Sequence, residues 1–228
     1  MGTMKEINIL YEDNHILVAE KPPNMLSQGD NTGDADILTL LKKNIKERYN
    51  KPGNVYLGLV HRLDRPVGGV MVFAKTSKGA ARLSDQIRTG MFRKSYFAVI
   101  HGIPEKLSAT LVNYLSKNEK TNTVAVVQKP EEGKEASLDY EVVDTKDGLS
   151  LIHINLHTGR PHQIRVQLAY AGHPLYGDQK YGASVNRHGM QLALWSAEIG
   201  FIHPTTKEPL IFRSMPPQVY PWNIFKCK

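Results

Sequence analysis

Short apolar runs separated by turn residues fill most of this 228-residue chain. Between residues 110 and 156, three strand-like runs follow one another at 124–127, 137–143 and 149–156. Strands joined by short polar turns pair with their neighbours, as in an antiparallel meander. The chain is therefore limited to folds that contain a large, mainly antiparallel sheet.

The rest of the chain adds further strands and three helices. Asp36 can cap the first helix, Ser77 can cap the second, and Pro161 can open the third. The sequence thus predicts an α+β fold in one domain, residues 1–228, with a large mixed, mainly antiparallel β-sheet flanked by helices and loops. Further strands are expected at 7–10, 15–19, 56–60, 70–74 and 95–100.

The composition says more about the partners of the chain than about its fold. The net charge is +7, from 29 Lys and Arg against 22 Asp and Glu, which favours polyanions such as nucleic acid. The single cysteine, Cys227, excludes a disulfide framework and a zinc site of several thiolates. The sequence lacks an apolar run of roughly 18 residues and a secretory signal. We expect a cytoplasmic monomer with no membrane association and no obligate protein partner.

Asp64 lies in a polar turn, residues 61–69, between two expected strands. His61, Arg62 and Arg65 flank it, and nearby cations favour the carboxylate form. The two glycines that end the turn leave a bare backbone that a ligand can approach. A carboxylate held in this way can attack a substrate or oppose positive charge. An Asp that only stabilises a turn would give the same pattern.

Arg165 follows Ile164 on the third expected helix, whose apolar face should be buried. A half-buried Arg needs an anion, and Asp64 could supply it, although Arg165 could equally lie on the solvent edge. Arg160 and His162, near the start of the helix, could bind phosphate together with its free N–H groups. An ordinary solvated loop is the alternative for these two residues.

Tyr96 lies in an apolar strand, where it can be a core aromatic or a phenol that stacks on a substrate ring and exchanges a proton. The histidines of residues 153–162 fit no metal-ligand spacing. The chain also lacks a glycine-rich phosphate loop. We therefore expect no metal site and no nucleotide cofactor.

Four motifs occur in a diagnostic order: HRLD at 61–64 with Gly69, Lys94-x-Tyr96, TGRPHQIR at 158–165, and GDQKYG at 177–182. In order and spacing the chain resembles the RluA family of pseudouridine synthases, over about residues 8–213. The resemblance implies the pseudouridine synthase fold and a single catalytic domain. It also implies a short form, without the N-terminal S4 RNA-binding domain of many members.

The implied activity is the isomerisation of specific uridines in rRNA or tRNA stem-loops to pseudouridine, with no cofactor. The N1–C1′ bond breaks, the uracil turns, and C5 bonds to C1′. By resemblance, Asp64 is the catalytic aspartate, Tyr96 packs against the base, and Arg165 pairs with Asp64. Arg62 enters the RNA and displaces the target nucleotide. Further RNA contacts are expected at His61, Arg65, Arg160, His162 and Gln163.

Three positions depart from the family pattern. Val67-Gly68 stands where Thr-Ser is frequent, and Gln167 and Trp195 stand where His is common. We expect these positions to affect the shape of the pocket, and therefore which uridine in the RNA is the target.

Two other functions fit the sequence. One is a non-catalytic RNA-binding protein that assists RNA folding on the same fold, and the other is a hydrolase with an Asp nucleophile. The set of Asp64, Tyr96 and Arg165 argues against the first, because binding alone does not require a carboxylate among arginines.

Overall fold

The computed structural model describes residues 7–226, which form two compact units. Unit 1 contains residues 7–92 and 196–214, and unit 2 contains residues 93–195 and 215–226. The expectation of one domain over the whole chain stays a prediction. Cys227 lies outside the described residues.

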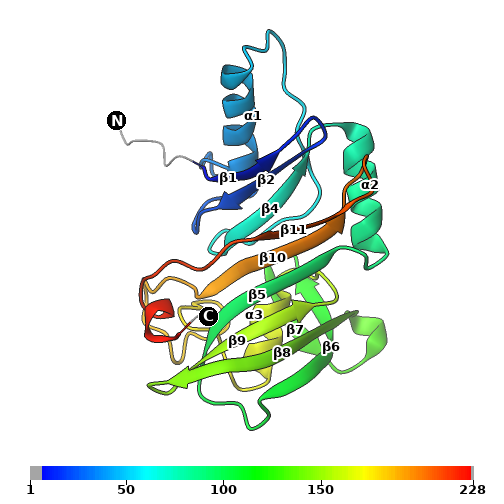
Figure 1. Cartoon of the computed structure of the whole chain (residues 1–228). Helices are drawn as coiled ribbons and strands as arrows, with labels where there is room; N and C mark the ends of the chain where they lie inside the picture. The colour runs from blue at the N-terminus through cyan, green and yellow to red at the C-terminus, as the bar shows by residue number, and fades with distance from the viewer. Residues whose placement is uncertain (1–6, 227–228) are drawn as a thin grey trace. The chain divides into compact units, whose positions relative to one another are not determined.

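Unit 1 is built on a sheet with the strand order β1, β2, β4, β10, β11, and the short β3 also pairs with β4 (Figure 1). The pairs β1–β2, β2–β4, β3–β4 and β10–β11 are all antiparallel. The elements are β1 (Ile9–Glu12), β2 (Ile16–Lys21), α1 (Ile37–Arg48), β3 (Gly58–Leu59), β4 (Gly68–Ala74), α2 (Ser77–Arg88), β10 (Leu194–Ile202, from residue 196 in this unit) and β11 (Pro209–Arg213).

Strand β4 is buried on both faces. Val70 and Val72 pack with Leu83 of α2 in one hydrophobic cluster. Because successive side chains of a strand point to opposite faces, Met71 and Phe73 point the other way, and both are fully buried as well. The polar turn that precedes β4 is therefore anchored to a rigid strand.

The structure confirms the predicted N-terminal cap of α1 but not that of α2. The Asp36 side chain accepts a hydrogen bond from Thr39 N at 2.9 Å, which confirms it as the cap of α1. The cap of α2 is Thr76, whose hydroxyl accepts from Gly79 N at 3.0 Å. The prediction of Ser77 is wrong because both residues offer a hydroxyl, and only the extended backbone of Thr76 aims its oxygen at the third helical N–H.

Unit 2 is an antiparallel sheet with the strand order β5, β9, β8, β6, β7, in which β8 pairs with β6 and β7 lies at the edge (Figure 1). Its β9 covers the predicted run 149–156, and β7 and β8 contain the other two, so the three strands are confirmed. The predicted meander is wrong for the first of them, because β6 pairs with both β7 and β8 and separates them. With few helices beside large sheets, the α+β class is confirmed too. The elements are β5 (Arg93–His101), β6 (Ser108–Asn118), β7 (Thr123–Val127), β8 (Lys134–Lys146), β9 (Leu149–Leu156), α3 (Gln163–Tyr170) and the 3₁₀ turns Pro130–Glu132 and Trp222–Ile224.

Helix α3 packs against β6 and β7. It begins at Gln163, and the prediction that Pro161 opens it is wrong. His162 has φ 53° and ψ 17°, in the left-handed region, so it lies outside the right-handed helix. Proline favours a helix start but does not decide where neighbouring contacts bend the chain.

The positions that depart from the family pattern are interior. Gln167 is buried in α3 and donates from its amide to Leu111 O and Ala136 O, at 3.2 Å each, which fastens the helix to β6 and β8. Val67 and Trp195 are buried as well. These residues therefore contribute to the framework of their units.

A neighbouring strand leaves no room for a side chain at Gly69. Its φ is +118°, and a Cβ at this position would stand 2.2 Å from the carbonyl oxygen of Ser196 in β10. The close approach that the sequence assigned to a ligand is thus made by protein backbone.

Gly69→Ala should destabilise the protein severely, because both the backbone angle and the space exclude a side chain. We expect a loss of about 4 kcal/mol or more in the free energy of unfolding, measured with urea. The matched control is Gly90→Ala, at φ +75° with open space around the position. It should cost about 1–2 kcal/mol, and similar losses in both variants would contradict this account.

Candidate active site

The Asp64 turn in unit 1 is held from two directions. Val67 N donates to the Asp64 carbonyl oxygen at 3.0 Å and closes the turn. The buried Ser27 hydroxyl donates to Leu63 O at 2.8 Å and accepts from Leu63 N at 3.1 Å. The half-buried Asp64 carboxylate is therefore presented by a fixed backbone.

Lys21, at the end of β2, is fully buried below this turn. Its ammonium donates to the carbonyl oxygens of Met25 at 2.7 Å, and of Pro22 and Arg65 at 3.1 Å each. Burial lowers the pKa of Lys21 to about 7, the Asp64 charge raises it, and the Arg65 charge lowers it. Sequence reasoning assigned no role to Lys21, which ends an apolar run in a segment that resembles the family.

The cations that flank Asp64 differ in their surroundings. Arg62 is exposed, and its side chain makes no hydrogen bond or ion pair with any residue from 7 to 226. Arg65 is paired with Asp34 at 2.7 Å. The His61 ring accepts a hydrogen bond from Val72 N at 3.1 Å and so supports the turn. RNA contacts by these residues stay predictions.

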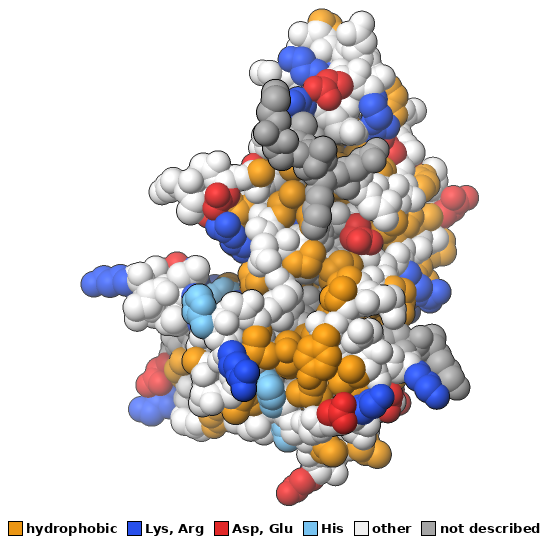
Figure 2. Space-filling model, turned by 90° about the vertical axis from the view of Figure 1, so that its left-hand side faces the viewer, with side chains coloured by type: hydrophobic (Ala, Val, Ile, Leu, Met, Phe, Trp, Pro, Cys, Tyr) orange, Lys and Arg blue, Asp and Glu red, His pale blue; other side chains and the backbone are white. Residues whose placement is uncertain are grey.

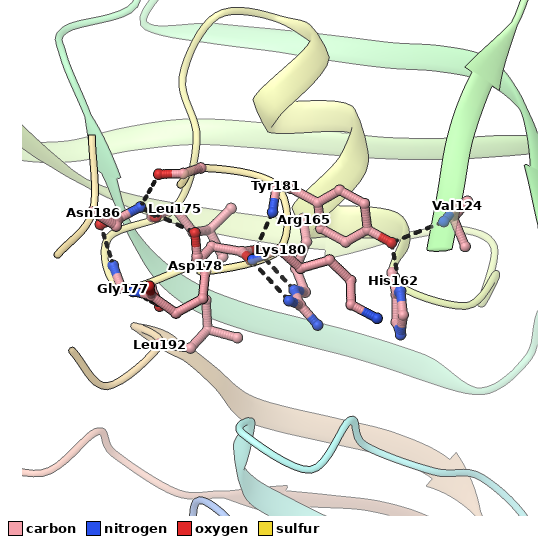
Figure 3. Close-up of polar contacts among 12 residues, drawn as sticks. Val124, His162, Arg165, Leu175, Gly177, Asp178, Lys180, Tyr181, Asn186 and Leu192 are labelled. Carbon is pink, nitrogen blue, oxygen red and sulfur yellow. Dashed lines mark hydrogen bonds and ion pairs between the residues drawn. The ribbon is translucent and has the colours of Figure 1, made fainter. Parts of the chain in front are cut away.

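Arg165 in unit 2 forms a two-pronged ion pair with Asp178 (Figure 3). The Nε and Nη2 atoms each lie 2.8 Å from one carboxylate oxygen, and both side chains are buried. Burial alone would raise the pKa of Asp178, but the hydrogen bonds and charge of Arg165 outweigh it and hold that pKa below its usual value. The expected partner Asp64 stays a prediction, and Asp178 is a partner that sequence reasoning missed.

Tyr181 covers Arg165 from a second side. The guanidinium carbon lies 5.1 Å from the ring centroid, which allows a cation–π interaction. The Tyr181 hydroxyl accepts from Val124 N at 2.9 Å and lies 2.6 Å from His162 Nδ1 (Figure 3). Tyr181 thus contacts two of the predicted site residues, His162 through its hydroxyl and Arg165 through its ring.

The loop that carries Asp178 is fastened by buried Asn186. The Asn186 side chain accepts from Gly177 N at 2.6 Å and donates to the carbonyl oxygens of Leu175 and Gly182 at 2.9 Å each. A Cβ at Gly177 would stand 2.1 Å from a neighbouring carbonyl oxygen. The motif at 177–182 therefore holds the carboxylate that pairs with Arg165.

A second fixed loop precedes α3. Gln163 is buried, and its side-chain oxygen accepts from Thr158 Oγ1 at 2.8 Å and Arg160 N at 3.0 Å. Its amide donates to Ser137 O at 3.1 Å. This gives Gln163 an internal role, and RNA contact by Gln163 or Arg160 stays a prediction.

Tyr96 lies in β5, directly opposite Ile154 of β9, and is buried. Lys94 points to the same face of the strand, two residues earlier. The phenol and the ammonium therefore share one surface of unit 2.

The face of the molecule drawn in Figure 2 carries charges of both signs. Figure 2 shows Lys and Arg side chains distributed over the face drawn, among uncharged and acidic groups.

Within residues 7–226, no group of three or more His, Cys, Asp or Glu side chains is placed so that it could hold a metal ion. In the same residues, none of the helices combines the length and apolar character of a membrane span.

The comparison with known proteins decides the family. Residues 15–170, which include the Asp64 turn, Tyr96 and Arg165, match the family model described as RNA pseudouridylate synthase. The chain belongs to this family. Its members are isomerases that act on uridine in RNA.

Two curated relatives of this pseudouridine synthase are bacterial. The uncharacterized RNA pseudouridine synthase YjbO of Bacillus subtilis is 33% identical over 93% of this chain and 73% of its own length. The ribosomal large subunit pseudouridine synthase C of Vibrio vulnificus is 34% identical over 89% of this chain. The match spans 63% of that relative's length, slightly less than two thirds.

Solved structures share the fold of this synthase. Human RNA pseudouridylate synthase domain containing 4 has a TM-score of 0.77 at 21% identity, covering 92% of this chain and 89% of its own. Human RNA pseudouridylate synthase domain containing 1 has a TM-score of 0.76 at 21% identity, over 96% and 87%. These similarities confirm the predicted pseudouridine synthase fold.

Asp178→Asn should destabilise the protein by about 3–5 kcal/mol at neutral pH, because it leaves the Arg165 charge buried without its counter-charge. The folded-state pKa of Asp178 lies below its ordinary 3.8, so its contribution is complete above that pH and is lost as the pH falls below it. Urea unfolding from pH 7 to 3 should show this loss in the wild type and not in the variant.

The control for this measurement is Asp85→Asn, which breaks an exposed pair with Arg88 in α2. It should cost less than about 1 kcal/mol. Equal losses in the two variants would contradict a stabilising role for the buried pair.

Proposed function

We propose that this protein converts specific uridines in structured rRNA or tRNA to pseudouridine, with Asp64 as the catalytic carboxylate and the target base turned out of its helix. The supporting observation is a half-buried carboxylate fixed on a rigid turn, beside a buried ammonium, inside the segment that matches the family. The names of relatives such as ribosomal large subunit pseudouridine synthase C support rRNA as one substrate.

The charge of Asp64 fits the first step of this reaction. Breaking the N1–C1′ bond builds positive charge on the sugar, which a fixed carboxylate opposes. The carboxylate can do so by bonding to C1′ or by supporting an elimination through C2′. The uracil then turns, C5 bonds to C1′, the C5 proton leaves, and N1 gains a proton.

One carboxylate is sufficient for an isomerase. A hydrolase of the same bond needs a second carboxylate to manage water, whereas an isomerase must exclude water from the reacting sugar. Tyr96, buried in β5, is proposed to pack against the uracil and to take up the C5 proton.

Arg165 is proposed to keep Asp64 ionised. Its Nε and Nη2 are fixed by Asp178 and its flat face by Tyr181, so the direction of the guanidinium is set in unit 2. We propose that Arg165 pairs with Asp64, as expected from the sequence.

RNA binding is proposed to depend on the excess of Lys and Arg. Phosphate contacts supply affinity that weakens with salt, and they offset the cost of a few kcal/mol for unstacking the target nucleotide. Arg62, exposed next to Asp64, is proposed to occupy the space that the nucleotide leaves. Because this reaction takes place on cellular rRNA or tRNA, the cytoplasm is the proposed location.

Asp64→Asn should abolish pseudouridine formation, by roughly 10³-fold or more, while RNA affinity stays near that of the wild type. The assay incubates purified protein with unmodified rRNA and tRNA transcripts and maps pseudouridine by chemical tagging. Asp85→Asn in α2 is the control and should keep full activity. Product formation by Asp64→Asn at the native rate would refute the catalytic assignment, and RNA binding without product by the wild type would favour an RNA-folding chaperone.

Arg62→Ala should slow turnover on a folded stem-loop about tenfold more than on a loosened strand of the same sequence, because only the folded RNA needs its base displaced. Initial rates on the two substrates give the ratio. Arg88→Ala, which removes an exposed cation of α2, should lower both rates equally. An equal loss on both substrates with Arg62→Ala would remove the base-displacing role.

A further inference from the structure

Lys94 is a partly buried cation without a counter-charge. It stands at the start of β5, and within residues 7–226 its ammonium makes no hydrogen bond and no ion pair. Burial lowers the pKa of Lys94, and no carboxylate opposes that shift. This differs from Lys21, which is satisfied by three carbonyl oxygens.

The ammonium lies against the bare backbone of Gly159. A Cβ at this glycine would stand 3.1 Å from Lys94 Nζ. The loop cannot easily move away, because Thr158 donates to Gln163 at 2.8 Å and accepts from Ser137 N at 2.9 Å. The Lys94 ammonium therefore lies against a fixed loop with which it makes no hydrogen bond.

A buried charge without a partner costs free energy, and such a group in a folded protein indicates a ligand or ion that completes it. Lys94 and Tyr96 share one face of β5, about 7 Å apart along the strand. A nucleotide packed on Tyr96 would bring a flanking phosphate within reach of the four-carbon Lys94 side chain. Lysine binds phosphate as a point charge.

We propose that Lys94 binds a backbone phosphate of the RNA next to the target uridine, and that Gly159 leaves the space for this contact. The inference rests on the proposed function for the identity of the anion. Lys94 would thereby locate the nucleotide over Tyr96.

The test measures binding of a fluorescein-labelled RNA stem-loop with a uridine-rich loop by anisotropy, at several salt concentrations. Lys94→Met should weaken affinity about tenfold at low salt and reduce the slope of log affinity against log salt by about 0.7, as expected for one lost phosphate contact. Lys94→Arg should keep the slope. Gly159→Ala should weaken binding by displacing the ammonium.

Stability provides the control. Lys94→Met removes an unpaired charge, so its free energy of unfolding should equal or exceed that of the wild type. Lys146→Met, at the exposed end of β8, should change neither affinity nor slope beyond the experimental error.

An unchanged slope with Lys94→Met, or a loss of binding explained by unfolding, would overturn the inference. The proposed function is tested separately by product formation. A wild type that binds RNA with this Lys94-dependent slope and makes no pseudouridine would refute the activity and keep the phosphate contact.

Discussion

The burial of the Arg165 charge is a strong constraint on the structure of unit 2. A buried guanidinium is tolerated only with a well-placed anion and with its remaining hydrogen-bonding groups satisfied. Asp178 meets the first requirement, and it stays in place because Asn186 fastens the surrounding loop. Tyr181 covers the guanidinium and links it to β7 through Val124. The loop, the helix and the strand therefore depend on one ion pair.

This synthase accommodates the charges of Arg165, Lys21 and Lys94 in three different ways. Arg165 has a carboxylate, Lys21 has three carbonyl oxygens, and Lys94 has no partner within the described residues. The first two are structural solutions to the same desolvation cost. The third leaves that cost uncompensated, which is the property expected of a group whose partner arrives with the substrate.

Much of the fold follows from local pattern. The period-two run at 149–156 and the helical spacing after Asp36 locate β9 and α1, because alternation and capping act over a few neighbouring residues. The start of α3 does not follow in this way, since His162 takes a left-handed conformation beside Tyr181, which lies 19 positions later. Likewise, two adjacent hydroxyls at the start of α2 are equivalent in sequence, and only the backbone geometry selects Thr76.

The sequence by itself determined the family, the fold class and the identity of the residues on which the chemistry is proposed to depend, because these are recorded in motif order and short-range spacing. Only the tertiary structure decided which groups satisfy the buried charges. Asp178 pairs with Arg165, and Lys21 lies beneath the Asp64 turn, because loops distant in sequence converge there. Electrostatic partners are selected by distance and burial in three dimensions, and neither quantity is expressed in the spacing of residues along the chain.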